Sequence, residues 1–282
     1  MPLGDGDRLR VIATTNILGD VVGNVGGDRI ELTTLMGVGI DPHSYVPTPA
    51  DTAAIHDAHL VLANGAGLEA NLAEMFDNAG GQAIKIQVSD GLQLRKPEAG
   101  HSDGEEEGEF DPHVWFDVNN TIRWVDVIAQ ALGALDPANA QVYEANAQVY
   151  RQQLDALDTW IVDQVATIPE ANRKLVTNHP AFGYFAGRYG VEQLGAVYPI
   201  SPSSEPSAQD VAALEDEIRK YGVPAVFTES TVNPRLAEQV ARDTGVQLIT
   251  LYTGSLGGPG SGAESYIQLM RFDVSTIVQA LR

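Results

Sequence analysis

The chain has no cysteine and few basic residues. Without cysteine it can form neither disulfides nor thiolate metal sites, so a metal would have to be held by nitrogen and oxygen atoms. Its 17 Lys and Arg stand against 38 Asp and Glu, which gives a net charge of −21. We therefore expect no binding to nucleic acid or to an anionic membrane surface, because both require a basic face.

The sequence also has no long apolar run, and we do not expect its first residues to be a signal peptide. No stretch approaches the roughly 20 apolar residues that span a bilayer. The hydrophobic content of 44% over 282 residues is enough for one large domain or two of ordinary size. Residues 1–7 are polar, which leaves open a cytoplasmic protein or a mature chain whose signal has been removed.

Segments with the pattern of strands alternate with segments with the pattern of helices along most of the chain. The predicted strands are 8–15, 30–36, 60–64, 84–88, 174–178, 191–197, 225–228 and 247–252. The predicted helices include 49–58, 69–78, 118–135, 181–189, 207–221, 234–244 and 264–281. This alternation is typical of doubly wound parallel α/β sheets.

A long helix is expected to start at Asp136-Pro137, where an N-cap acceptor precedes a proline at the first helical position. Thirty helical residues span about 45 Å, which is long for one domain. We therefore predict an N-terminal α/β lobe over 1–136, a linking helix over 137–168 and a C-terminal α/β lobe over 169–282. The alternative is a long helix lying on one large domain. The apolar stripe of this helix is predicted to comprise Val142, Val149, Leu154, Leu157, Ile161, Val165 and Ile168.

Residues 96–110 interrupt the alternation of strands and helices. They include three glycines and five glutamates, so this segment has too little apolar surface to order itself by burial. We expect a mobile loop. His101 within it could capture a metal transiently but could not hold one tightly alone.

Two Asp-Pro-His triplets, at 41–43 and 111–113, stand out in a chain with six histidines. Proline fixes its own φ and disfavours the helical conformation of the aspartate before it. Each histidine is therefore expected on a short rigid segment, which suits an imidazole that must point at a metal. Either histidine alone could equally well cap a local turn.

A third histidine, His179, follows a predicted strand in the second half of the chain. Open α/β sheets bind ligands beyond the carboxyl ends of their strands, and Asn64, Glu229 and Thr253 occupy similar positions. The gaps between the three histidines, 113 − 43 = 70 and 179 − 113 = 66 residues, exclude a zinc-finger knuckle and favour a site between two lobes. Three neutral imidazoles suit zinc best, with copper, nickel, cobalt and manganese possible. We expect the remaining pair, His56 and His59, at the surface.

Several longer motifs resemble those of the metal-specific substrate-binding proteins of bacterial ABC importers for zinc and manganese. The resemblance covers nearly the whole chain. Its most specific parts are Asp41-Pro42-His43-Ser44-Tyr45 with 47–51, Asn64-Gly65 with Glu69, Asp111-Pro112-His113-Val114-Trp115-Phe116-Asp117, 179–185, Phe227-Thr228-Glu229-Ser230 and Met270-Arg271.

The resemblance implies two α/β lobes joined by a long helix, with the metal between them and His43, His113 and His179 as ligands. Histidine at position 179, where manganese-preferring members often have glutamate, favours Zn²⁺ over manganese. The family implies a monomer in the periplasm, or anchored outside the cytoplasm, that delivers its ion to a membrane ABC permease. Zinc-specific members often carry a flexible loop where 96–110 lies.

One position departs from the family pattern. The family usually supplies a fourth ligand, an aspartate, from the turn after the last strand, and Gly254 stands at the matching position here. Water, a carboxylate such as Glu229 or Asp41, or a loop residue could take that place.

Two other functions remain open from the sequence. A zinc hydrolase or hydratase would use three histidines and a bound water, with Glu229 as general base. No phosphate-binding glycine loop and no His-Glu-x-x-His motif supports such an enzyme. A binding protein for a larger metal chelate would need arginines or aromatic residues in an open cleft, and the chain has only 17 basic residues.

Overall fold

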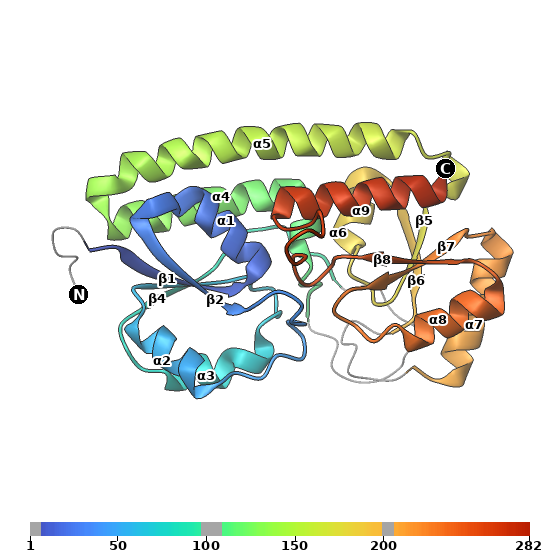
Figure 1. Cartoon of the computed structure of the whole chain (residues 1–282), viewed down its shortest axis with the longest axis horizontal. Helices are drawn as coiled ribbons and strands as arrows, with labels where there is room; N and C mark the ends of the chain where they lie inside the picture. The colour runs from blue at the N-terminus through green and yellow to red at the C-terminus, as the bar shows by residue number, and fades with distance from the viewer. Residues whose placement is uncertain (1–6, 97–108, 199–205) are drawn as a thin grey trace.

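Two parallel sheets of four strands organise the chain (Figure 1). The computed structural model describes residues 7–96, 109–198 and 206–282. The first sheet has the order β2-β1-β3-β4 and the second the order β6-β5-β7-β8, so the lobes repeat one topology. Every strand pair is parallel, which confirms the predicted fold class. The strands are β1 Leu9–Thr15, β2 Ile30–Met36, β3 Leu60–Ala63, β4 Ile84–Gln87, β5 Lys174–Thr177, β6 Glu192–Ala196, β7 Ala225–Glu229 and β8 Gln247–Leu251.

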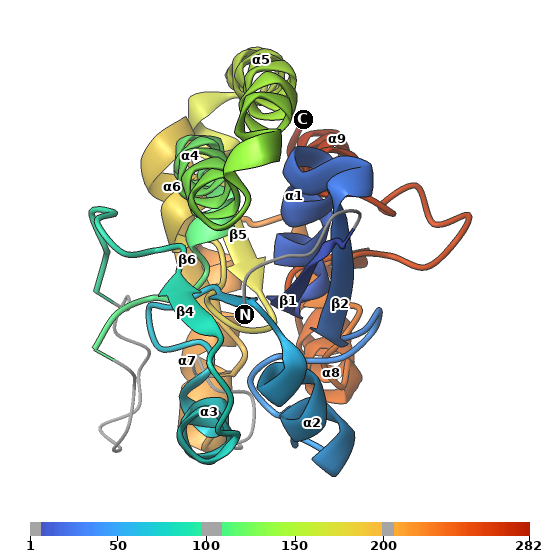
Figure 2. The same cartoon turned by 90° about the vertical axis from the view of Figure 1, so that its left-hand side faces the viewer.

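Helices cover both faces of each sheet. In the first lobe α1 (Asn16–Gly26) and α4 (Val118–Leu135) lie on one face, and α2 (Pro49–Asp57) and α3 (Ala73–Asn78) lie on the other (Figure 2). The central strands are therefore buried on both sides: Val11 packs toward α1, and Ile12 packs into a smaller core under α2 and α3. This explains why β1 reads as a continuous apolar run.

The second lobe is built in the same way. Helices α6 (Gly183–Tyr189) and α9 (Tyr266–Leu281) cover one face of its sheet, and α7 (Ala208–Tyr221) and α8 (Arg235–Thr244) cover the other. Its strands also alternate between two cores, as Val226 and Phe227 show.

One large hydrophobic core runs through both lobes on the side of α1, α4, α6 and α9. It extends from Leu9 to Leu281, and the rings of Phe116 and Phe182 meet across it at a centroid distance of 4.4 Å. Helix α5 (Ala140–Ala166) has 27 residues and lies along both lobes (Figure 1). At 1.5 Å per residue it is about 40 Å long. The lobes are therefore joined by shared packing as well as by the chain.

The buried face of α5 differs from the predicted stripe. Val142 and Val149 are 38% and 57% exposed, so their assignment to the core was wrong. Tyr143, Ala147 and Tyr150 are buried in their place. The tyrosine hydroxyls explain the difference, because that of Tyr143 donates to Asp136 and that of Tyr150 to Asp20, which satisfies both polar ends inside the core.

The start of this helix also differs from the prediction. A 3₁₀ turn, Pro137–Asn139, precedes α5, and the Asp136 carboxylate accepts from the side chain of Asn139 at 2.7 Å instead of capping the helix backbone. The predicted mobile loop, with His101, falls mostly on residues 97–108, which lie outside the described residues. Within the described ranges, no helix is both long enough and apolar enough to span a bilayer.

Replacing Leu154 with alanine tests the role of α5 in the shared core. Leu154 is fully buried, so Leu154→Ala should lower the free energy of unfolding by about 2–5 kcal/mol. Val149→Ala on the same helix is the matched control, and it should change that free energy by less than about 0.5 kcal/mol. Denaturant unfolding of the metal-free protein measures both. Equal effects of the two substitutions would contradict the assigned buried face.

Candidate metal centre

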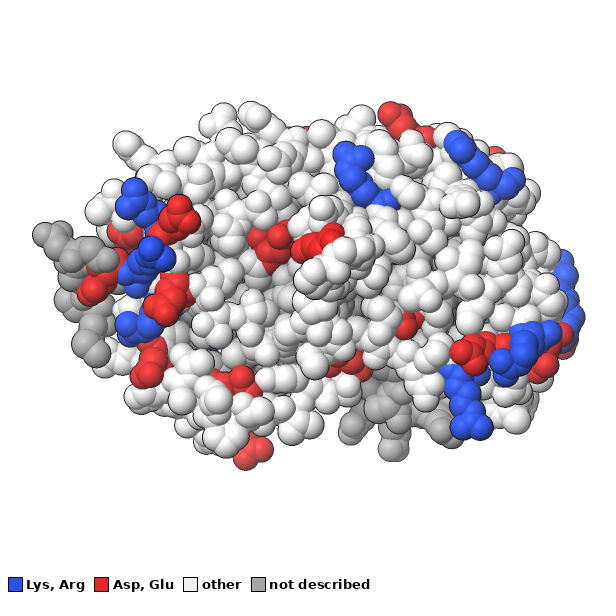
Figure 3. Space-filling view, in the orientation of Figure 1, with Lys and Arg blue, Asp and Glu red and all other residues white. Residues whose placement is uncertain are grey.

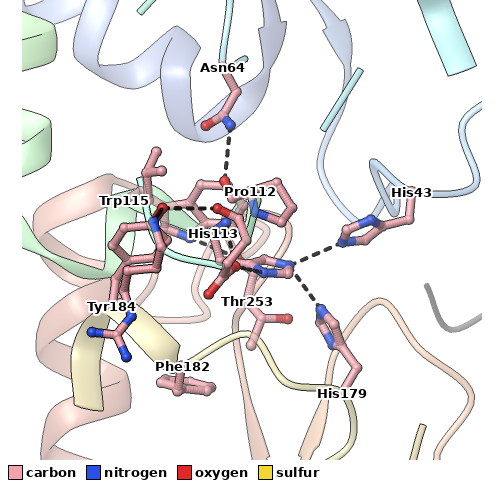
Figure 4. A network of polar contacts seen from close by, with 12 residues as sticks. His43, Asn64, Pro112, His113, Trp115, His179, Phe182, Tyr184 and Thr253 are labelled. Atoms are coloured by element: carbon pink, nitrogen blue, oxygen red, sulfur yellow. Dashed lines mark hydrogen bonds and ion pairs between the residues drawn. The ribbon is translucent and has the colours of Figure 1, made fainter. Parts of the chain in front are cut away.

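Three histidines from distant parts of the chain meet at the carboxyl ends of the two sheets (Figure 4). His43 lies in the loop after β2, His113 precedes the 3₁₀ helix Val114–Phe116, and His179 follows β5. Nε2 of His113 is 3.1 Å from Nε2 of His43 and 3.0 Å from Nε2 of His179. In the part of the chain that the structure describes, no other group of three His, Asp or Glu converges in this way.

The two Asp-Pro-His triplets adopt the same local structure. Asp41 Oδ1 accepts the backbone N–H of His43 at 3.0 Å, and Asp111 Oδ1 accepts that of His113, also at 3.0 Å. Each aspartate thus closes an Asx turn around its proline. Asn64, at the carboxyl end of β3, donates to the carbonyl of Pro112 at 3.0 Å and fixes the second triplet in the first lobe (Figure 4).

Carboxylates orient the two buried rings. His113 Nδ1 lies 2.8 Å from Asp111 Oδ1, and His179 Nδ1 lies 2.5 Å from Glu229 Oε1. The hydroxyl of Thr253 donates to the other oxygen of Glu229. This network assigns the Nδ1 proton to both rings, so Nε2 of each points to the centre of the cluster. Hydrogen bonding of Nδ1 to a carboxylate is the usual way in which a metal-binding histidine is held.

The pKa values of the three imidazoles are shifted in different directions. Burial, with the neighbouring imidazoles, sets the pKa of His43 well below its ordinary value. Burial also lowers the pKa of His113, more than Asp111 raises it. For His179 burial is outweighed by the charge and hydrogen bond of Glu229, so its pKa is raised. Of the three, His179 therefore takes up a proton most readily, and that proton would compete with a metal for Nε2.

The candidate carboxylates for a fourth ligand are engaged elsewhere. Glu229 binds the backbone N–H and the ring of His179, and its pKa is lowered because His179 and Thr253 outweigh its burial. Asp41 accepts from the backbone of His43 and from the hydroxyl of Ser44 at 2.8 Å. Neither belongs to the group of converging ligand atoms. Both carboxylates instead position a histidine of the cluster: Asp41 binds the backbone of His43, and Glu229 binds the backbone and ring of His179.

Gly254 lies where a side chain would meet the first triplet. Its φ is outside the left-handed region, so the backbone does not require glycine. A Cβ at this position would lie 2.9 Å from Cδ of Pro42, which is too close for ordinary contact. Its neighbour Thr253 is fixed, because its carbonyl accepts from Trp115 Nε1 at 3.2 Å. A side chain at position 254 would therefore require Pro42 or the turn after β8 to shift.

The remaining histidines of the described residues lie apart from this cluster. His56 is exposed, with Nδ1 3.1 Å from the carbonyl of Ala79. His59 is partly exposed and accepts from the backbone N–H of Arg10 at 2.9 Å. Neither joins the cluster.

Sequence reasoning missed the supporting role of Asp111 and Thr253. Asp111 is part of the repeated triplet, and Thr253 was one of the polar residues expected at strand ends, so the signals were present. It also missed Asn16, which directly follows β1 and binds the turn after β8. The rule that drew attention to Asn64 would have found it.

Comparison with known proteins identifies the family. The profile of a family described as "Zinc-uptake complex component A periplasmic" matches residues 11–280. The chain belongs to this family. Members of it are substrate-binding transport proteins that work outside the cytoplasm, so the chain is extracytoplasmic and is not an enzyme. This decides against the zinc hydrolase and against a cytoplasmic protein.

Relatives within the family carry names for two metals. The chain is 37% identical over 281 residues to the "Manganese-binding lipoprotein MntA" of Halalkalibacterium halodurans, covering 98% of this chain and 90% of that protein. The structure of the "periplasmic zinc binding protein TroA" from Treponema pallidum has a TM-score of 0.87 at 33% identity, covering 98% and 99% of the two chains. The manganese-bound periplasmic metal-binding protein of Candidatus Liberibacter asiaticus has a TM-score of 0.85 at 30% identity, covering 98% and 100%.

Glu229→Gln tests the orientation of His179. Glutamine retains an acceptor for Nδ1 but removes the charge, and loss of such a supporting group typically weakens metal binding by about 10–100-fold. A chelator-competition titration of Zn²⁺ measures the change. The matched control is Glu238→Gln on α8, whose carboxylate is paired with exposed Arg242. Equal affinities of wild type and Glu229→Gln would show that Glu229 does not support the site.

The raised pKa of His179 predicts acid sensitivity of metal binding. A ligand imidazole must be neutral, and the pKa of His179 lies above the ordinary 6.5, so protons begin to compete with metal above that pH. Lowering the pH from about 7.5 to about 5.5 should weaken binding by at least roughly tenfold. Calorimetry in buffers of different ionisation enthalpy should also detect proton release on binding near pH 7. Affinity that stays constant over this range would argue against imidazole ligands.

Proposed function

We propose that this chain binds a divalent transition metal through Nε2 of His43, His113 and His179 and delivers it to the membrane permease of an ABC importer. The observation that carries the proposal is the convergence of three Nε2 atoms, two of them on buried rings held by carboxylates. A buried imidazole cluster without a cation would gain little from this arrangement, whereas a metal uses all three lone pairs.

Capture and release follow from the exposure of the three rings. His113 and His179 are buried, and His43 is only partly buried, so the ion enters and leaves on the side of His43. The two buried ligands are fixed by Asp111 and Glu229 before the ion arrives, which reduces the ordering cost of binding. The loop of His43 is the part that completes or opens the site.

Zinc is the metal that the donor set favours. Among the described residues, three imidazole nitrogens converge without a carboxylate, a donor set that suits Zn²⁺, whereas Mn²⁺ prefers oxygen ligands. Manganese is the second candidate, because several relatives are named as manganese-binding proteins. We propose that water or a small anion takes the fourth coordination position, since Gly254 offers no side chain there.

The organisation of the chain is part of the same proposal. We infer lobes over 1–136 and 169–282 with a linking segment over 137–168, and a monomer as the working form. The repeated strand order and the length of α5 support this division.

A metal titration with competing chelators tests the function. Wild type should bind one Zn²⁺ tightly, and Mn²⁺ at least about a hundredfold more weakly. His113→Ala should abolish tight binding, whereas His56→Ala, which removes an exposed histidine outside the cluster, should leave it unchanged. Tight Mn²⁺ binding with weaker Zn²⁺ binding would select the second candidate. Absence of tight binding of either metal would overturn the proposal.

A pair of substitutions at Gly254 tests the fourth position. Gly254→Ala and Gly254→Asp both introduce the Cβ that meets Pro42, so their comparison isolates the added carboxylate from the displacement of the triplet. We expect Gly254→Asp to bind Zn²⁺ at least about tenfold more tightly than Gly254→Ala, about 1.4 kcal/mol. The same chelator titration applies. Equal affinities would indicate that a protein group already occupies the fourth position.

A further inference from the structure

Helix α1 of the first lobe forms hydrogen bonds with the segment that connects β8 to α9 in the second lobe. The side-chain oxygen of Asn16, the first residue of α1, accepts the backbone N–H of Leu256 at 2.8 Å. Its amide donates to the hydroxyl of Ser255 at 2.9 Å and to the carbonyl of Gly37 at 2.8 Å. One side chain therefore binds both lobes at once.

Ser255 completes a connection to the loop that carries His43. Its hydroxyl oxygen accepts the backbone N–H of Gly39 at 2.8 Å, and the serine is fully buried. Gly39 has φ of +80° in a tight turn closed by the bond from the Ile40 N–H to the Gly37 carbonyl, a conformation that favours glycine. The turn presents its amide to Ser255 four residues before His43.

A second residue of α1 also forms a hydrogen bond with this connection. Asp20, one helical turn after Asn16, accepts the backbone N–H of Tyr266 at 3.0 Å, at the first residue of α9. Helix α1 thus holds both ends of the β8–α9 connection. Segment 253–263 contains no charged residue, and few charged side chains lie over the middle of this face (Figure 3). Hydrogen bonds and packing, not ion pairs, close the lobes here.

We infer that Asn16 and Ser255 form an interlobe clasp that holds the His43 loop in its ligating position and sets how fast the metal leaves. The inference rests on the proposed function. The turn after β8 contributes no imidazole or carboxylate to the converging cluster, and Gly254 has no side chain, so no such ligand ties this turn to the ion and the first lobe. The clasp and the contact of Gly254 with Pro42 supply that connection. Asn16 and Ser255 are positioning residues, since neither belongs to the ligand cluster.

Metal release kinetics test the clasp. Zinc-loaded protein is mixed with excess chelator in a stopped-flow instrument, using wild type, Asn16→Ala and Ser255→Ala. Each clasp variant should release Zn²⁺ about tenfold faster, the scale expected for the loss of one or two hydrogen bonds, without slower association. Both substitutions remove the hydrogen bond between Asn16 and Ser255. The release rate of the double variant should therefore increase by less than the product of the two single increases. Asn24→Ala, which removes an exposed asparagine bonded only within α1, is the control and should match wild type.

Amide hydrogen exchange of the metal-free protein provides a second readout. The amides of Gly39 and Leu256 should be protected in wild type, because Ser255 and Asn16 accept from them. Ser255→Ala should expose the first amide and Asn16→Ala the second. Release rates within about twofold of wild type in both variants, or unprotected amides in metal-free wild type, would overturn the clasp. A wild type that binds no metal would instead overturn the proposed function, and the exchange experiment would still test the clasp.

Discussion

Two buried hydrogen bonds between imidazole and carboxylate fix the centre of this molecule, one from His113 to Asp111 and one from His179 to Glu229. The His113–Asp111 pair belongs to the first lobe, and the His179–Glu229 pair connects the ends of β5 and β7 in the second lobe. The two pairs therefore bring imidazoles from both lobes to one place. Each bond occupies Nδ1 and turns Nε2 inward. Moving either carboxylate would turn a potential ligand away and leave a buried charge without its partner.

The rest of the fold keeps these two pairs at a constant separation. The continuous core under α5, with the contact of Phe116 and Phe182, holds the carboxyl ends of both sheets opposite each other. Motion is therefore expected mainly in segments that are held by hydrogen bonds and not by packing in the core. The His43 loop, tied by Asn16 and Ser255, is such a place. In the proposed function, two rigidly held ligands and one adjustable ligand would suit a protein that must both hold an ion and give it up.

Much of this could be predicted from the sequence, because the signals are local. The apolar runs placed all eight described strands, and the proline-fixed triplets drew attention to His43 and His113. The predicted buried face of α5 was wrong. Two tyrosines, whose hydroxyls donate to carboxylates outside the helix, are buried where two valines were expected. The position of Asn16 at the end of β1 could have been noticed, but its partners and the contact of Gly254 with Pro42 could not be predicted, since both contacts join opposite lobes. Asn16 and Ser255 are separated by 239 residues in the sequence.

X-ray absorption spectroscopy of the zinc-loaded protein tests the central claim most directly. It reports both the number of imidazoles around the ion and the remaining light-atom ligands. Three imidazoles should be seen at about 2.0–2.1 Å, with one further oxygen or anion at a similar distance. A first shell with one imidazole or none, dominated by oxygen atoms, would contradict the assignment of His43, His113 and His179 as the ligands.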